Sequence, residues 1–387
     1  MKALVIGGSN GIGLVISGKL IARGMRVIIM DRVPPEAGYL PVGGYEYIFS
    51  DLMELDEDQF ASFAKDPELG LLMVTAGIGR VADFASMHTA EIRKMMTINA
   101  VSVLQILRIF YDRIRNQTPF YCGVMGSIAG LLCSPAAAVY ASSKAAVCRL
   151  VESVNVELEA AGTTNRILNV APGSFQGSRF YGGRNQPELL EGLAEEILVR
   201  LFASETLFIP GYEETFRDVL ERYHANPHEY GMHSYRFKQQ SGRLDNSRRV
   251  VIGYLSGTFD LFHVGHLNLL RRARHECDYL IVGVHESGAW KGKETFIPFE
   301  ERKAIVASCR YVDKVVDSCV EDSDAWELWH FDRLFVGSDY KGTERFNRYE
   351  EFFKPKGVEI IYFPYTQGTN STQIRKTVQM RTESSEK

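Results

Sequence analysis

The chain has 387 residues, of which 45% are hydrophobic and 24% charged, and its formal net charge at pH 7 is −4. This length exceeds one ordinary domain and the composition is that of a soluble globular protein, so we expect two domains. The small net charge excludes a general attraction to nucleic acid or to acidic membranes, so any anion site must be local.

Short apolar runs and helical patterns alternate along the first part of the chain. Strands are predicted at residues 3–6, 26–30, 45–49, 71–75, 121–125 and 167–170, and helices near 12–23, 91–115 and 138–161. Such alternation predicts right-handed crossovers and a parallel sheet that is covered on both faces.

Residues 205–249 break this rhythm, with a helix predicted at 213–224 and a polar linker at 236–248. Alternation resumes at residue 249, with strands predicted at 250–255, 279–284, 333–336 and 358–362. The fold class we predict is therefore α/β, with two doubly wound, Rossmann-like parallel-sheet domains in tandem at residues 1–235 and 249–387.

The chain carries no apolar run of membrane-spanning length, and a strand pattern begins at its start without a signal sequence. Its six cysteines lack C-x-x-C spacing, which is typical of reduced thiols. We expect a cytoplasmic protein with neither a membrane nor a nucleic-acid partner.

A glycine-rich turn follows the first predicted strand. Gly7, Gly11 and Gly13 allow the backbone to turn tightly and to approach a pyrophosphate at the helix N-terminus. Asp31 ends the second predicted strand, where its carboxylate would accept hydrogen bonds from an adenosine ribose; a solvated charge at a strand end is the alternative.

Tyr140 and Lys144 are four residues apart on a predicted helix and therefore share one face. The ammonium would lower the pKa of the phenol, and a nearby serine such as Ser127 would hold a carbonyl oxygen while the phenol transfers its proton. Each residue alone is most often structural, but together with Asn99 and the glycine turn they form an ordered set.

This set resembles the short-chain dehydrogenase/reductase family over residues 1–205. The resemblance implies a catalytic tetrad of Asn99, Ser127, Tyr140 and Lys144 and binding of NADH or NADPH. The implied cofactor-binding residues are Gly7, Gly11, Ile12, Gly13, Asp31, Arg32, Asp51, Ala76, Gly77, Pro172 and Gly173. Thr75 departs from the usual asparagine, and Gly177-Ser178 replaces the usual threonine. Asp31 would repel a 2′-phosphate whereas Arg32 would attract one, so both cofactors stay open.

The segment after Pro172 corresponds to the substrate loop of that family. Its arginines Arg179 and Arg184 suit a phosphorylated substrate, since guanidinium groups bind phosphate in a bidentate manner. An ordinary solvated basic loop is the alternative.

A second motif, Gly-Thr-Phe-Asp-Leu-Phe-His-Val-Gly-His, lies at residues 257–266. His263 and His266 sit three apart at the start of a predicted helix, where they would form a phosphate pocket. Their spacing also permits a metal pair, but no further His/Cys cluster lies near in sequence, so we predict no metal site.

The motif resembles the cytidylyltransferase family typified by glycerol-3-phosphate cytidylyltransferase, over residues 249–377. The resemblance implies CTP as co-substrate, with Mg²⁺, and charge-neutralising roles for His263, His266, Lys291 and Arg302. It implies nucleotide binding by Gly257, Thr258, Phe259, Asp339, Thr366, Ser371 and Thr372. Tyr365 stands where the family usually has arginine.

A carbonyl reductase and a cytidylyltransferase on one chain suggest consecutive steps. We expect reduction of a ketose phosphate, favouring ribulose 5-phosphate, and then transfer from CTP to give a CDP-alditol, favouring CDP-ribitol, and pyrophosphate. Two alternatives stay open. The chain could make CDP-glycerol or another CDP-polyol, with the reductase acting on a different or CDP-linked keto substrate, or the N-terminal half could be a non-catalytic nucleotide sensor. Both resemblances imply a homo-oligomer.

Overall fold

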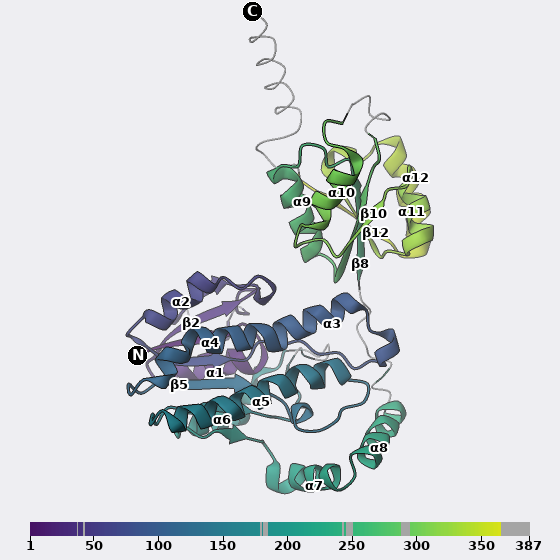
Figure 1. Cartoon of the computed structure of the whole chain (residues 1–387). Helices are drawn as coiled ribbons and strands as arrows, with labels where there is room; N and C mark the ends of the chain where they lie inside the picture. Colours follow the sequence, from purple (N-terminus) through teal and green to yellow (C-terminus); the bar gives the residue numbers. More distant parts are fainter. Residues whose placement is uncertain are drawn as a thin grey trace, which may run out of the picture. The chain divides into compact units, whose positions relative to one another are not determined.

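The computed structural model describes residues 1–36, 38–41, 43–178, 180, 185–241, 244, 251–287 and 295–364. The chain divides into two compact units, residues 1–248 and 249–387, each with its own parallel sheet (Figure 1). This confirms the predicted fold class of two α/β domains in tandem.

The first unit contains a seven-stranded parallel sheet in the order β3-β2-β1-β4-β5-β6-β7. The strands are β1 (Lys2–Ile6), β2 (Arg26–Asp31), β3 (Tyr45–Phe49), β4 (Leu69–Val74), β5 (Tyr121–Met125), β6 (Ile167–Val170) and β7 (Leu207–Phe208). The strand order reverses between β1 and β4, and ligands of such sheets bind in the crevice at the carboxyl ends of the strands at this point.

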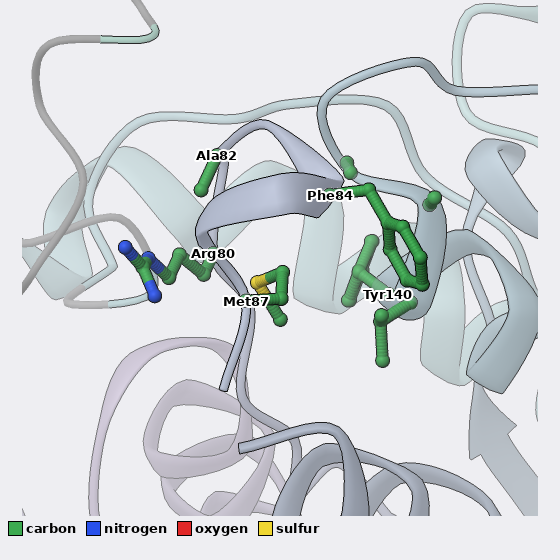
Figure 2. A pocket seen from close by; sticks show the side chains of 8 residues that line it. Arg80, Ala82, Phe84, Met87 and Tyr140 are labelled. Carbon is green, nitrogen blue, oxygen red and sulfur yellow. The ribbon is translucent and has the colours of Figure 1, made fainter. Parts of the chain in front are cut away.

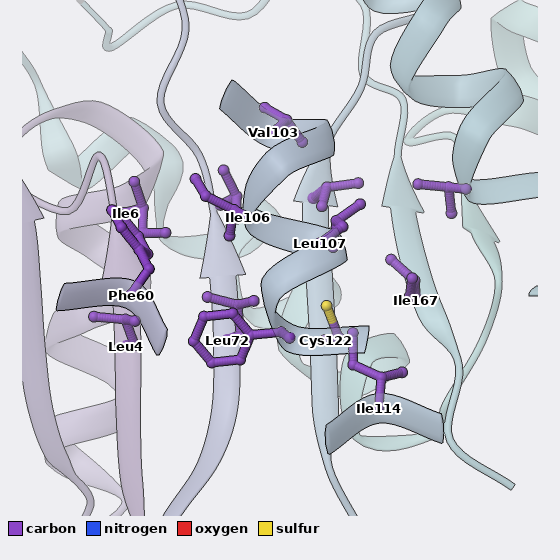
Figure 3. Packing of buried hydrophobic residues seen from close by; sticks show 14 of the residues in the cluster. Leu4, Ile6, Phe60, Leu72, Val103, Ile106, Leu107, Ile114, Cys122 and Ile167 are labelled. Atoms are coloured by element: carbon purple, nitrogen blue, oxygen red, sulfur yellow. The ribbon is translucent and has the colours of Figure 1, made fainter. Parts of the chain in front are cut away.

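Helices cover both faces of this sheet because successive strand residues point to opposite sides. Leu4 and Ile6 of β1 pack with α2 (Glu57–Lys65), α4 (Ser102–Arg115) and α5 (Ala138–Ala160), as Figure 3 shows for part of this cluster. Ala3 and Val5 pack on the other face with α1 (Gly11–Ala22) and α6 (Glu191–Phe202).

The helix predicted over residues 91–115 is divided into three parts. These are α3 (Thr89–Met96), a π-helical turn (Thr97–Val101) and α4. Single π turns inside helices are frequent at functional sites, and this one carries Asn99.

Two more helices follow β7, α7 (Arg217–Ala225) and α8 (Pro227–Gln240), after a π-helical turn (Tyr212–Phe216). Residues 236–240, which the sequence predicted as part of an extended linker, instead complete α8. Asn226 caps this helix by accepting from the Glu229 N–H at 3.1 Å, and Pro227 takes its first position.

The second unit has a five-stranded parallel sheet in the order β10-β9-β8-β11-β12, which reverses between β8 and β11. Its strands are β8 (Ile252–Gly257), β9 (Tyr279–Val284), β10 (Lys314–Asp317), β11 (Arg333–Gly337) and β12 (Glu359–Phe363). Residues of α9 (Val264–His275) and α10 (Phe299–Ala307) pack in one buried cluster, and those of α11 (Asp322–Trp329) and α12 (Glu344–Phe353) in the other.

In the part of the chain that the structure describes, none of the helices combines the length and the apolar character needed to cross a bilayer.

Candidate functional sites

The glycine turn after β1 is packed so closely that side chains do not fit at two of its positions. Gly7 has a φ of +82°, and a Cβ there would lie 2.5 Å from the Ala76 nitrogen. A Cβ on Gly13 would lie 2.2 Å from the Gly7 carbonyl oxygen. Gly11 opens α1 with a φ of +53°, and the Ile12 side chain is buried in the core. This narrow backbone cradle at a helix N-terminus fits a dinucleotide pyrophosphate.

Thr75, which departs from the family asparagine, supports the base of this turn. Its hydroxyl lies 3.0 Å from the carbonyl oxygens of both Ile6 and Gly7, to which it donates. Two residues later, a Cβ on Gly77 would lie 3.4 Å from both Asn99 Oδ1 and Lys144 Nζ. The end of β4 therefore connects the glycine turn to the proposed catalytic residues.

Asp31, Arg32 and Asp51 lie together at the carboxyl ends of β2 and β3. The Asp31 carboxylate accepts from the backbone N–H of Ser9 at 3.1 Å and of Arg32 at 2.7 Å. Burial raises the pKa of Asp31, and these bonds oppose that rise. Arg32 Nε lies 3.5 Å from Asp51 Oδ2, so the Arg32 cation already faces a carboxylate.

The side chain of Asn185 accepts a hydrogen bond from one of the backbone N–H groups of the glycine turn that would otherwise face a cofactor. The Gly11 N–H donates to Asn185 Oδ1 at 3.0 Å, and the Asn185 amide donates to Glu36 at 2.9 Å. No sequence pattern pointed to Asn185, because it comes from a segment distant in the chain.

Tyr140 and Lys144 lie on one face of α5 and are both buried. Lys144 Nζ lies 5.9 Å from the centre of the Tyr140 ring and donates to the Met125 carbonyl at 2.7 Å. Burial lowers the pKa of Lys144 to about 8. The ammonium therefore lies beside the ring of the tyrosine that the resemblance implies as the proton donor.

Asn99 ties the loop after β4 to α5. Its Oδ1 accepts from the Ile78 N–H at 2.8 Å, while its Nδ2 lies 2.7 Å from the Ile78 carbonyl and 3.1 Å from Ser143 Oγ. The side chain is fully buried on the π-helical turn. Asn99 therefore fixes the backbone beside Gly77 and the helix that carries Tyr140.

Ser127 follows β5 and is joined to the loop after β6. Its hydroxyl accepts from the Ala129 N–H at 3.2 Å and lies 3.4 Å from the Pro172 carbonyl, which also accepts from Ile128 at 3.0 Å. Gly173 is covered by Phe216, whose ring would lie 2.4 Å from a Cβ at that position.

A pocket opens beside Tyr140, lined by Arg80, Ala82, Phe84, Met87 and residues 137–139 (Figure 2). The Phe84 ring lies beside Tyr140 in this view, whereas Arg80 lies across Met87 from it. Arg80 pairs with Glu91 at 2.6 Å, and sequence reasoning missed this pair. Phe180 packs its ring edge-on at 5.4 Å from Tyr140, while Arg179 and Arg184 lie outside the described residues.

In the second unit, His263 and His266 stack at the start of α9 with their ring centres 4.0 Å apart. His263 Nδ1 accepts from the Gly265 N–H at 3.0 Å, so the neutral imidazole carries its proton on Nε2 and can donate to a phosphate. Burial lowers the pKa of both, that of His266 to about 4. His266 Nδ1 is buried without a hydrogen-bond partner among the described residues.

The loop between β8 and α9 is held in an unusual conformation. Phe259 and Leu261 have φ of +53° and +52°, a left-handed region that side-chain-bearing residues seldom adopt. Between them, the buried Asp260 carboxylate accepts from the backbone N–H of Phe296 and of Ile297, the latter at 3.0 Å. Such strained backbone is common at ligand sites, and Asp260 fixes it.

Arg302, for which the resemblance implies a charge-neutralising role, directs its guanidinium at backbone carbonyls. It is fully buried and donates to the carbonyls of Ile297, Thr258, His285 and Glu286 at 2.6 to 2.9 Å. These donors are committed to backbone, so Arg302 joins the loops around the site. The sequence motif predicts that position 302 carries a positive charge. It cannot predict that the side chain is buried, because the carbonyls around it come from segments distant in the chain.

Only some of the other residues predicted to bind the nucleotide are among the described residues. Gly257 ends β8, and its carbonyl accepts from the His285 N–H at 2.9 Å. Asp339 lies in the turn after β11, the strand that neighbours β8 across the reversal in strand order. Lys291, Tyr365, Thr366, Ser371 and Thr372 lie outside the described residues.

The described residues contain no group of three or more metal-ligating side chains. Within each unit, the sequence-predicted residues that are described lie at the carboxyl ends of the strands or on the helices that follow them.

Both units match known families. Residues 1–187 match the family model for short chain dehydrogenases, and residues 254–383 match the model for cytidylyltransferase-like proteins. The glycerol-3-phosphate cytidylyltransferase of Staphylococcus aureus is 38% identical over 130 residues, which cover 33% of this chain and 92% of that protein. That of Bacillus subtilis is 33% identical over 132 residues, covering 33% of this chain and 95% of that protein.

A solved structure of a short-chain dehydrogenase from Sphingobium yanoikuyae in complex with NADPH is similar to the first part of this chain. The match covers 58% of this chain and 95% of that protein. Its sequence identity is 18% and its TM-score 0.47.

Proposed function

Because the chain belongs to the cytidylyltransferase family through its second domain and carries a short-chain dehydrogenase domain before it, we propose that it makes a CDP-alditol in two steps. The first domain would reduce a ketose phosphate with NADH or NADPH. The second would couple the resulting alditol phosphate to CMP from CTP and release pyrophosphate.

Two separate sets of reactive side chains on one chain support this function. Tyr140 and Lys144 lie beside the loop of Gly77, which continues from the glycine cradle. His263 and His266 stack at a helix N-terminus behind a strained loop. An N-terminal domain that only senses nucleotide would not need a buried ammonium beside a tyrosine.

In the reductase site, the glycine cradle and Asp31 would hold the dinucleotide, and the nicotinamide supplies a hydride to the carbonyl carbon when it is bound. Ser127 would donate a hydrogen bond to the carbonyl oxygen. Tyr140 would give its proton to that oxygen as the alkoxide forms, and the Lys144 ammonium stabilises the phenolate that is left.

In the transferase site, an oxygen of the alditol phosphate would attack the α-phosphorus of CTP. A new phosphorus–oxygen bond forms as the bond to the bridging oxygen breaks, and pyrophosphate leaves with the bonding electrons. His263 Nε2–H and His266 would donate to phosphate oxygens. Mg²⁺, which the resemblance implies, would neutralise charge on the triphosphate.

The fused reductase favours an alditol other than glycerol. A CDP-glycerol synthase could use ready-made glycerol phosphate and would not require a reductase on the same chain. We therefore favour ribulose 5-phosphate as substrate and CDP-ribitol as product. We place the linker after α8 rather than at residue 236 and, as both families suggest, propose a homo-oligomer.

Two variants test this function. Tyr140→Phe should make CDP-ribitol from CTP and ribitol 5-phosphate but not from ribulose 5-phosphate with NAD(P)H. His266→Ala should oxidise NAD(P)H with ribulose 5-phosphate yet release no pyrophosphate. If Tyr140→Phe still converts ribulose 5-phosphate to CDP-ribitol at the unmodified rate, the first domain is not the reductase that we propose.

A further inference from the structure

Polar side-chain contacts join the helical pair α7–α8 to the rest of the first unit. No side chain of these two helices, all of whose residues are described, is buried. Tyr223 and Tyr230 pack edge-on at 5.7 Å between the helices. The pair lies beyond the part that matches the short-chain dehydrogenase model, which ends at residue 187.

The contacts of α8 converge on the wall of the pocket beside Tyr140. Lys238 Nζ donates to Ser134 Oγ at 2.8 Å and to the Pro135 carbonyl at 2.6 Å. One turn earlier, Tyr235 donates to Asp83 at 3.0 Å. Phe84 and residues 137–139 line the pocket. Asp83 directly precedes Phe84 in the chain, and Pro135 lies two residues before residue 137.

The segment that Lys238 holds is strained and leads directly into the catalytic helix. Ala136 has a φ of +60°, although alanine has no special tolerance for the left-handed region. The Ala137 N–H donates to the Ser134 carbonyl at 3.0 Å, and the Ala136 carbonyl accepts from Ala82 at 2.7 Å. α5 begins at the next residue, 138, and Tyr140 is its third residue.

We propose that Lys238 is a positioning residue of the reductase: its ammonium holds the turn at residues 134–137 and thereby fixes Tyr140 and the pocket wall. A charge-assisted bond to a carbonyl and a second bond to a hydroxyl hold this turn more firmly than neutral contacts would. The inference rests on the proposed reductase activity and adds α8 to the reductase site.

Three variants of the full chain test this role. Lys238→Met removes the ammonium and keeps the bulk, Lys238→Arg keeps a cation that can donate to the same oxygens, and Arg236→Met removes an exposed cation from the same helix. The assays are NAD(P)H oxidation with ribulose 5-phosphate, nucleotide affinity by fluorescence, and pyrophosphate release from CTP and ribitol 5-phosphate.

Lys238→Met should lower the kcat of reduction by about tenfold, the loss expected for a charge-assisted hydrogen bond. The Kd for NAD(P)H and the transferase rate should not change, Lys238→Arg should recover most of the loss, and Arg236→Met should match the unmodified chain. Unchanged kcat in Lys238→Met, or an equal loss in nucleotide affinity, would overturn the proposal.

Hydrogen exchange separates this inference from the proposed function, because it needs no substrate. Peptides that cover residues 134–141 should exchange faster in Lys238→Met than in the unmodified chain or Arg236→Met. If the unmodified chain reduces no ketose phosphate, the proposed function fails whatever the exchange shows. Unchanged exchange in Lys238→Met overturns the positioning role by itself.

Discussion

The backbone N–H of Gly11 donates to the side-chain oxygen of Asn185, 3.0 Å away, although 174 positions separate the two residues. The same N–H lies at the helix N-terminus where a cofactor pyrophosphate is expected, so Asn185 and the cofactor compete for it. Asn185 thus contacts the glycine turn directly.

Replacing Asn185 with alanine should therefore tighten nucleotide binding. A neutral hydrogen bond contributes about 0.5–1.5 kcal/mol, so the Kd for NAD(P)H should fall about two- to tenfold in Asn185→Ala. Titration of nucleotide fluorescence measures this, with Asn226→Ala, which removes a cap distant from the cradle, as the control. Weaker binding by Asn185→Ala would mean that Asn185 holds the cofactor instead of competing with it.

The buried ammonium of Lys144 should lower the free energy of unfolding of the first domain. Its pKa falls from 10.5 to about 8 on burial, which corresponds to about 3 kcal/mol of destabilisation at pH 7. Lys144→Met removes this cost but leaves the Met125 carbonyl unpaired, at about 1 kcal/mol. Without nucleotide, the variant should therefore be more stable at pH 7 by about 2 kcal/mol on these figures.

This stability difference should depend on pH in one direction. Below pH 8 the folded and unfolded chains both hold the proton, and the full cost is present. As the pH rises from about 8 to 10.5, the folded chain releases the proton first, so the advantage of Lys144→Met should shrink. Denaturant unfolding at pH 7 and pH 10 measures both values, and a growing advantage would contradict the assignment of a buried charge.

CTP binding should draw protons onto the histidine pair. Burial lowers the pKa of His266 to about 4 and that of His263 below its usual value, so both are neutral at pH 7 in the free protein. Adjacent phosphates favour the protonated forms and raise both pKa values. Calorimetry in buffers of different ionisation enthalpy should show proton uptake that grows between pH 8 and pH 6.

Two variants make this measurement specific. His266→Asn should reduce the uptake, whereas His275→Ala, which changes an exposed histidine at the end of α9, should leave it unchanged. Uptake that persists in full after His266→Asn would place the titrating group elsewhere.

Arg302 should act on the stability of the second domain. Arg302→Met leaves four carbonyls without their donor and should destabilise this domain by about 3–5 kcal/mol, as the removal of one member of a buried polar set does. Calorimetry should show its transition at a lower temperature and that of the first domain unchanged. Unchanged stability with a raised KM for CTP would show that Arg302 binds phosphate instead.

What the sequence could predict was local. The glycine turn and the Tyr140–Lys144 pair lie within one turn or one helix, so spacing alone places them. Lys238 and Asn185 bond to partners more than 100 positions away, and no spacing rule connects such segments. The burial of Arg302 likewise depends on carbonyls from three loops.

There are physical reasons why two elements could not be predicted from the sequence. β10 spans only Lys314–Asp317, with a charge at each end, and is too short for a recognisable pattern. α8 ends in the polar, Lys/Arg/Gln-rich stretch that begins at residue 236, and this polarity favoured a connector. Asn226-Pro227 was the available signal, because asparagine before proline is a typical helix start.

Isotope transfer between the two reactions tests the two-step account most directly. The full chain is incubated with ribulose 5-phosphate, CTP and NAD(P)H that carries deuterium at the transferable position of the nicotinamide. The account predicts CDP-ribitol that carries one deuterium by mass spectrometry, together with one pyrophosphate per nicotinamide oxidised. Pyrophosphate release without NAD(P)H, or a CDP-linked product without deuterium, would contradict it.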